Sequence, residues 1–143
     1  MQIHLYDSAA QVGQAAATLI AAQIIAKPDS VLGLATGSTP VGMYKELVQM
    51  FDEGRIDFSQ VKTVNLDEYA GLPGNNDQSY RYFMNQNLFD HINIDKANTN
   101  VPDGTAADLQ AECERYEQVV ASMGGVDIQL LGIGNNGHIA FNE

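Results

Sequence analysis

Short apolar runs and longer stretches with helical spacing alternate along the chain. The short runs have the length and composition of strands, and they end at glycine, proline or polar residues. The predicted strands cover residues 2–6, 31–35, 61–66 and 126–131, and the predicted helices cover residues 8–27, 40–53, 79–88 and 105 or 108 to 123. This β-α-β-α order predicts an α/β fold with a mainly parallel sheet and right-handed crossovers.

The first predicted helix is rich in alanine and carries an apolar stripe. The apolar positions expected to share one face are Val12, Ala16, Leu19, Ile20 and Ile24. The longest apolar stretch, within residues 15–26, is interrupted by polar side chains and is shorter than a bilayer span. We therefore expect a helix of the protein core.

The second predicted strand ends in the sequence TGSTP, residues 36–40. A strand, a glycine-containing turn with hydroxyls and a helix bring backbone N–H groups, hydroxyls and the positive end of a helix dipole to one point, which suits a phosphate group. The turn lacks the lysine and the length of a P-loop, so it favours a small phosphorylated metabolite over a nucleoside triphosphate. From this stretch alone, a plain helix cap with Thr39 at the N-cap and Pro40 at the first helical position is an equal alternative.

Acidic residues follow the third predicted strand. Ligands of open α/β sheets bind beyond the carboxyl ends of the strands, so Asp67 is expected to face the same crevice as the TGSTP turn. Asp67 is preferred to Glu68 because it directly follows the strand, although the alternation of side chains allows either. The alternative is that both residues are solvated or cap the next turn. In the helix that follows, Tyr80 is expected on the core face, and Arg81 is the nearest cation.

The fourth predicted strand ends in GIGNNGHIAFNE, residues 132–143. Its glycines allow positive φ and close approach to a ligand, and its asparagines tolerate left-handed conformations, which predicts a tight, ligand-accessible loop. The loop carries His138 and, five residues later, Glu143, and an imidazole and a carboxylate can act as general acid/base and orienting partner. In isolation such a loop is more often a connection whose histidine caps or packs. Because three predicted strands end in unusual loops, we favour one shared site.

Composition narrows the function classes. With 143 residues and 45% hydrophobic content, the chain fits a single globular domain with a core. A formal net charge of −11, with only seven Lys and Arg, argues against nucleic acid or a membrane surface as partner. Cys113 is the only cysteine and lies on an apolar helical stripe, so we expect no intrachain disulfide and a buried, unreactive thiol. The absence of an export leader predicts a cytoplasmic protein, and no residue spacing resembles a metal site.

Three motifs, taken in order, resemble those of the glucosamine-6-phosphate deaminases, also called glucosamine-6-phosphate isomerases. They are LGLATGSTP at residues 32–40, NLDEY at residues 65–69 and GIGNNGHIAFNE at residues 132–143. Related sugar-phosphate enzymes such as 6-phosphogluconolactonases share any one of them, but NLDEY together with GHIAFNE is more specific to the deaminases. The resemblance implies a Rossmann-like open sheet with helices on both faces. It also implies conversion of glucosamine 6-phosphate and water to fructose 6-phosphate and ammonia, without a metal or organic cofactor, in amino sugar catabolism.

The resemblance also implies roles for individual residues. Asp67 matches the base that takes the C2 proton of the opened sugar and returns it to C1, as an aldose–ketose isomerisation requires. His138 matches the acid/base that opens the pyranose ring, and Glu143 matches the carboxylate that assists it. The residues that match the phosphate-binding turn are Ser38 and Thr39, with the amides of Thr36 and Gly37.

The chain departs from the family pattern in two places. Many members have an aspartate where this chain has Asn136, whose amide can orient a neighbour but carries no charge. Members are also longer, and this chain stops at Glu143 within a motif, so we expect a truncated chain that lacks further strands, a lid and basic phosphate ligands. We expect the 143 residues alone to be inactive, and the sequence allows a homo-oligomer.

Two other function classes make different demands on these residues. A sugar-phosphate binding or sensing module would use the TGSTP turn without needing Asp67 and His138 in one crevice, and release of ammonia from glucosamine 6-phosphate separates it from the deaminase. A lactone hydrolase of the related fold matches NLDEY poorly. Turnover of the amino sugar phosphate compared with 6-phosphogluconolactone separates the two enzymes.

Overall fold

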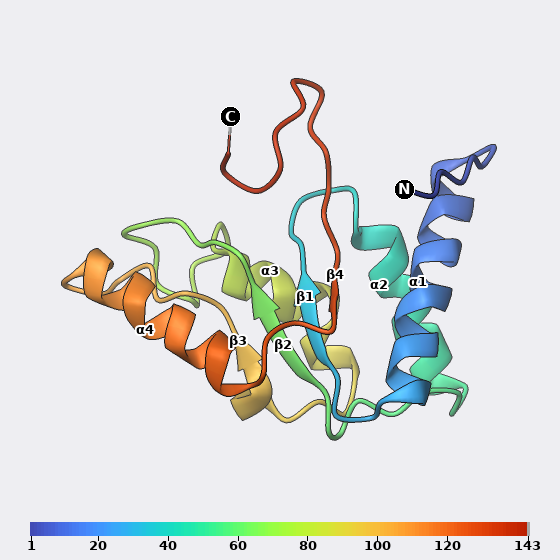
Figure 1. Cartoon of the computed structure of the whole chain (residues 1–143), viewed down its shortest axis with the longest axis horizontal. Helices are drawn as coiled ribbons and strands as arrows, with labels where there is room; N and C mark the ends of the chain where they lie inside the picture. Colours follow the sequence, from blue (N-terminus) through green and yellow to red (C-terminus); the bar gives the residue numbers. More distant parts are fainter. Residues whose placement is uncertain (143) are drawn as a thin grey trace.

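The computed structural model describes residues 1–142 and has a parallel sheet at its centre (Figure 1). Its strands are β1 (Val31–Leu34), β2 (Lys62–Asn65), β3 (Thr99–Asn100) and β4 (Ile128–Gln129), in the spatial order β3-β2-β1-β4. The helices are α1 (Ala9–Ala26), α2 (Val41–Asp52), α3 (Tyr80–Asn87) and α4 (Leu109–Ser122), with 3₁₀ turns η1 (Phe89–His91) and η2 (Lys96–Asn98). The open, parallel Rossmann-like sheet predicted from the sequence is confirmed.

The hydrophobic core lies between the sheet and the helices α1, α2 and α3. Leu32 and Leu34 of β1 point into it, as period-two alternation requires for one face of a strand. Helices α1 and α2 approach closely because Gly13 has no side chain, and a Cβ there would lie 3.2 Å from the backbone of Gly42 and Met43. These contacts fix the position of α2, and therefore of the turn that leads into it.

Helix α1 is a core helix, but its buried face is offset from the predicted stripe. The buried residues are Gly13, Ala17, Ile20, Ala21 and Ile24. Val12 and Leu19 are exposed, so the predicted face was wrong at these positions, whereas Ile20 and Ile24 are buried as predicted. The whole helix has 18 residues and by length and hydropathy could cross a membrane, which corrects the expectation of too short a stretch. Its buried residues nevertheless belong to the protein core.

Helix α4 covers the opposite face and is drawn in front of the sheet in Figure 1, with α3 behind it. The hydroxyl of Tyr116 joins it to two strands, donating to the carbonyls of Asn65 (2.8 Å) and Asn100 (3.0 Å) and accepting from the Asn65 amide (3.2 Å). Burial raises the pKa of Tyr116 to about 12, so this hydroxyl keeps its proton. Helices therefore lie on both faces of the sheet.

Three local expectations were wrong. Residues 2–6 form no strand, because no described strand pairs with them, and Leu5 is 92% exposed. Cys113 is exposed rather than buried, since the side of α4 that meets the sheet carries Tyr116 instead. The stretch between α3 and α4, which is not among the predicted strands, contributes β3, and this strand pairs with β2.

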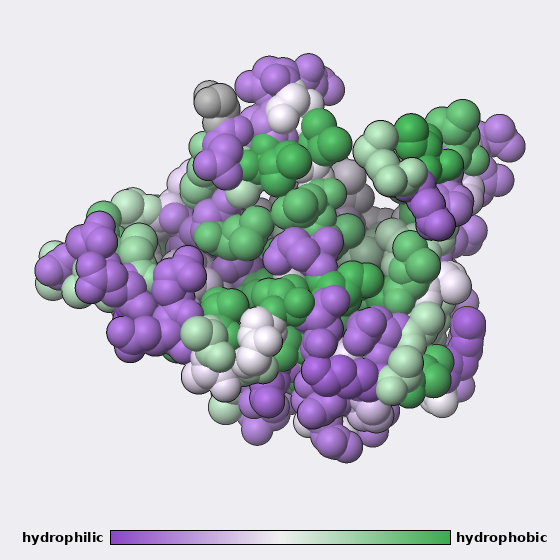
Figure 2. Space-filling view, viewed as in Figure 1, coloured by the Kyte–Doolittle hydropathy of each residue, from purple (hydrophilic) through white to green (hydrophobic). Residues whose placement is uncertain are grey.

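Strand β4 is shorter than predicted and lies at one edge of the described sheet. Apolar side chains are exposed around it at Val126, Leu131 and Ile133. Figure 2 shows apolar residues gathered over the middle of this face, where β4 and the following segment run. Edge strands of this kind are sites at which further chain can pair.

Candidate functional site

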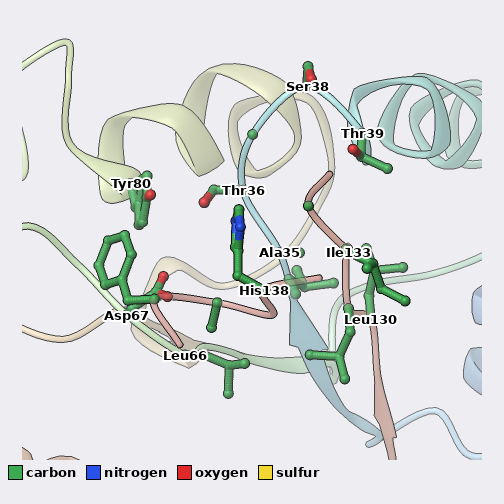
Figure 3. Close-up of a pocket in the computed structure, with 17 residues that line it drawn as sticks. Ala35, Thr36, Ser38, Thr39, Leu66, Asp67, Tyr80, Leu130, Ile133 and His138 are labelled. Carbon is green, nitrogen blue, oxygen red and sulfur yellow. The ribbon is translucent and has the colours of Figure 1, made fainter. Parts of the chain in front are cut away.

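The carboxyl ends of β1, β2 and β4 meet at a cavity of about 290 Å³. Figure 3 shows Thr36, Asp67, Tyr80 and His138 around one hollow, and each comes from a different segment. The cavity thus brings together the three loops that the sequence singled out. Of the predicted site residues, those that line it are Thr36, Gly37, Ser38, Thr39, Asp67 and His138.

The turn after β1 lines the cavity, and its hydroxyls do not cap the helix that follows. Gly37 has φ of +89°, a conformation that side chains disfavour. Pro40 occupies the N-cap of α2, and no described side chain makes the N-cap hydrogen bond. The alternative with Thr39 as the cap was therefore wrong. The exposed Ser38 and Thr39 line the cavity at the positive end of the α2 dipole.

Asp67 lies at the end of β2 with its side chain partly buried in the cavity wall. Burial raises the pKa of this carboxyl, the negative charge of Glu68 raises it further, and a hydrogen bond from the Phe141 backbone lowers it. The net direction is upward. A carboxylate with a raised pKa holds an abstracted proton better than an ordinary aspartate, as a general base at neutral pH requires.

Glu68 does not line the cavity. Its carboxylate accepts backbone hydrogen bonds from Tyr80 (2.9 Å) and Arg81 (3.0 Å) at the start of α3. The alternation along the strand therefore favours Asp67 as the cavity residue, and the capping alternative applies to Glu68. The Arg81 side chain is turned away and donates to the Thr99 side chain (2.7 Å) and carbonyl (3.0 Å).

His138 lies in a compact turn after β4. The Gly134 amide donates to the His138 carbonyl (2.9 Å), and the Gly137 amide, at φ +85°, donates to the Gly134 carbonyl (2.9 Å). The imidazole lies over Gly134, where a Cβ would come within 2.2 Å of the ring. Glycine at position 134 is therefore what allows the ring to occupy this place.

Asn136 orients the imidazole. Its side-chain oxygen accepts from the His138 backbone amide (3.2 Å) and lies 2.5 Å from the ring Nδ1. Since an amide oxygen can only accept, the proton belongs on Nδ1, and Nε2 remains the atom for proton transfer in the neutral ring. The remaining predicted site residue, Glu143, lies outside the described residues.

Tyr80 is a cavity residue that the sequence assigned to the core face of α3. Its ring packs against Tyr69 (centroids 4.8 Å apart) and Phe141 (5.7 Å), and its hydroxyl is 3.3 Å from that of Tyr69 and hydrogen-bonds Thr36. Burial and the Tyr69 contact raise the pKa of Tyr80, so the hydroxyl remains protonated. The signal that identifies it is position: it is the first residue of a helix that begins beside the cavity.

The assembled groups suit proton transfer on a phosphorylated small molecule. A partly buried carboxylate and an oriented imidazole line the cavity together with a turn of hydroxyls and amides. Within residues 1–142, no group of three or more His, Cys, Asp and Glu side chains is arranged to hold a metal ion.

Known proteins with the same features identify the family. A family model described as glucosamine-6-phosphate isomerases/6-phosphogluconolactonase matches residues 6–141. The chain is 58% identical to glucosamine-6-phosphate deaminase of Lachnoclostridium phytofermentans and 55% identical to that of Halothermothrix orenii. Each match covers 100% of this chain, but only 61% and 59% of the relative. The chain thus spans about 60% of the length of these relatives.

Solved structures agree with this assignment. A monomeric glucosamine-6-phosphate deaminase superimposes with a TM-score of 0.98 at 48% identity, covering 100% of this chain and 59% of that one. A 6-phosphogluconolactonase from Thermotoga maritima superimposes with a TM-score of 0.77 at 23% identity, covering 96% and 61%, and shows the shared fold. The chain belongs to the family of glucosamine-6-phosphate isomerases and 6-phosphogluconolactonases.

Proposed function

We propose that this chain is the amino-terminal part of a cytoplasmic glucosamine-6-phosphate deaminase of amino sugar catabolism. The observation that carries the proposal is that Asp67, His138 and the turn 36–39 line one cavity. A module that only binds a sugar phosphate has no need of the two acid-base groups. The high identity to proteins named glucosamine-6-phosphate deaminase supports the same substrate.

In the proposed reaction the turn holds the substrate phosphate, so that the sugar extends toward Asp67 and His138. His138 moves a proton between the ring oxygen and the C1 hydroxyl and opens the pyranose. Asp67 takes the C2 proton and returns it to C1, while the C1 carbonyl oxygen gains a proton and the amine loses one, which converts the aldose amine to a ketose imine. Water then adds at C2 and ammonia leaves, giving fructose 6-phosphate. The Nδ1 contact to Asn136 supports this role for His138, because it leaves Nε2 free.

Two assignments extend beyond the described residues. We propose that Glu143 assists His138 by favouring the charged imidazole, a role that the neutral Asn136 cannot take. We also propose that the longer protein supplies cations to the phosphate. The chain carries a net charge of −11, and the turn offers only amides, hydroxyls and a helix dipole worth roughly 0.3–1 kcal/mol. Charge-assisted hydrogen bonds would offset that repulsion.

The remaining part of a longer protein would also complete the sheet. Strand β4 lies at an edge of the described sheet, and Leu131 and Ile133 beside it are exposed. A strand that pairs there would cover these side chains and exclude water from the cavity. For this reason we expect residues 1–143 alone to bind glucosamine 6-phosphate weakly and to lack deaminase activity.

Ammonia release from glucosamine 6-phosphate tests the proposal. The native-length protein is assayed for ammonia and fructose 6-phosphate, with hydrolysis of 6-phosphogluconolactone measured in parallel. Turnover of the amino sugar phosphate with little lactonase activity is expected. Binding of the amino sugar phosphate without ammonia release would favour a binding module, and preferential lactone hydrolysis would favour a lactonase. Calorimetric titration and the same assay on residues 1–143 test the requirement for the longer protein.

A further inference from the structure

Glu68 makes an unusual set of hydrogen bonds for a residue outside the cavity. One carboxylate oxygen accepts from the amides of Tyr69 (2.8 Å) and Tyr80 (2.9 Å), and the other accepts from the amide of Arg81 (3.0 Å). Two of these bonds cross 12 and 13 residues of sequence. They join the loop that follows β2 directly to the amino end of α3.

An ordinary helix cap does not account for this arrangement. Helix α3 already has its own cap, because the Ser79 side chain accepts from the Tyr82 amide (3.0 Å). Glu68 accepts from the two preceding amides, those of Tyr80 and Arg81, and Glu68 is the residue next to Asp67 in the chain. Amides at a helix start favour a negative charge, so an ionised carboxylate is the best partner for them.

The two residues that Glu68 links both belong to the cavity wall. Asp67 precedes it in the chain, and the Tyr80 amide is one of its partners. We propose that Glu68 is a positioning residue, whose carboxylate fixes the Asp67 side chain and the Tyr80 ring relative to each other for the proton transfer. The proposal rests on the proposed function for its chemistry and on these hydrogen bonds for its geometry.

The position of Tyr80 matters because two other aromatic rings pack against its ring. Its ring is stacked with Phe141 at an interplanar angle of 29° and packs on Tyr69. Phe141 belongs to the segment that carries His138, and its backbone hydrogen-bonds Asp67. A shift of α3 against β2 would therefore move the aromatic wall and the contact of that segment with the base.

Glu68 also acts on Asp67 through its charge. The groups that face Asp67 are Glu68 on its own loop, the hydroxyl of Tyr80 on α3, and His138 and the Phe141 amide on the segment after β4. Arg81 does not compensate Asp67, because its guanidinium is bound to Thr99. Removing the Glu68 charge should therefore lower the pKa of Asp67.

Two substitutions of Glu68 in the native-length protein distinguish the effect of its charge from the effect of its side-chain length, and a third substitution serves as a control. Glu68→Gln keeps the size and removes the charge, and Glu68→Asp keeps the charge and shortens the side chain. Asp108→Asn is the matched control, because Asp108 caps α4 through the Ala111 amide (3.0 Å) and does not line the cavity. The pKa of Asp67 is followed by carboxyl NMR, and amide hydrogen exchange reports Tyr80 and Arg81.

We expect Glu68→Gln to lower the pKa of Asp67 and Glu68→Asp to change it less. Both should speed exchange of the two amides and lower kcat by up to about 10²-fold with little change in KM, as a misplaced base does. Asp108→Asn should leave all three readouts unchanged. An unchanged pKa together with equal losses in all variants would overturn the proposal. The NMR and exchange readouts require no turnover, so an inactive wild-type protein would refute the proposed function and leave this test intact.

Discussion

The two proposed acid-base groups differ in how the surrounding chain is fixed: by hydrogen bonds between distant segments at Asp67, and by local hydrogen bonds at His138. Asp67 belongs to a corner between β2 and α3 that is tied by Glu68 to the start of a helix and closed by a hydrogen bond from the Gly71 amide to the Gly104 carbonyl (2.6 Å). His138 belongs to the segment after β4, residues 130–142, where the hydrogen bonds around the ring come from within residues 134–138. Phe141 links this segment to the corner through its contacts with Tyr69 and Tyr80.

Because of this difference, substitutions in the two regions should affect the stability of the fold and the proton transfer to different extents. The corner is part of the framework, so a change that shifts its backbone should lower the free energy of unfolding as well as disturb proton transfer. The segment after β4 carries few described framework contacts, so a change there should disturb proton transfer while leaving the fold nearly intact. Four predictions test this comparison.

Asp67→Asn should have the largest effect. An amide has nearly the shape of the carboxylate but cannot accept the C2 proton, so we expect kcat to fall by about 10² to 10⁴-fold with substrate binding nearly unchanged. Steady-state kinetics and calorimetric binding on the native-length protein measure the two quantities. Retention of wild-type turnover would move the base to another residue.

His138→Gln should chiefly harm ring opening. Proton transfer at the ring oxygen is needed for the closed sugar only, so we expect a loss of about 10²-fold on the cyclic substrate and a smaller loss on an open-chain analogue. The melting temperature should change little, because the ring packs on Gly134 within its own turn. Equal losses on both substrates would contradict this division of labour.

Two glycine substitutions compare the regions directly. A Cβ at Gly104 would lie 2.1 Å from the Tyr69 carbonyl oxygen, so Gly104→Ala must shift backbone and should cost roughly 1–3 kcal/mol of unfolding free energy. A Cβ at Gly134 would instead meet the His138 ring, which can swing away. Gly134→Ala should therefore cost less stability while lowering activity. Denaturant unfolding and turnover are measured for both variants, and equal destabilisation would remove the distinction.

The smallest effect concerns pH. The pKa of Asp67 is raised in the folded state, so the folded protein favours the protonated carboxyl over the ionised carboxylate. The stability gained from the protonated form is fully present below the ordinary pKa of 3.8 and is lost as pH rises through the pKa of the folded state. Asp67→Asn should therefore raise the melting temperature at neutral pH, with the gain disappearing near pH 3. The acid limb of wild-type turnover should lie above the ordinary aspartate value. A stabilising effect that is independent of pH would contradict the assignment.

Local sequence determined the elements and the chemistry they carry. Apolar periodicity with Ser8, Ser79 and Asp108 as caps specifies α1, α3 and α4, because the signals are contained within a few residues. The carboxyl ends of parallel strands meet at one edge, so the order of elements also brings the three motifs together. That is why a shared cavity with Asp67 and His138 could be predicted without coordinates.

Only the tertiary structure decided the features that depend on contacts between residues distant in the sequence. Residues 2–6 have strand composition but no described partner, and a strand exists only when its backbone groups are paired. The buried face of α1 includes Gly13 because α2 approaches there, and the apolar periodicity of the sequence does not indicate this contact. Likewise, Asp67 and Glu68 are adjacent acids in the sequence. The structure places Asp67 in the cavity wall and binds the Glu68 carboxylate to amides 12 and 13 residues away, at the start of α3.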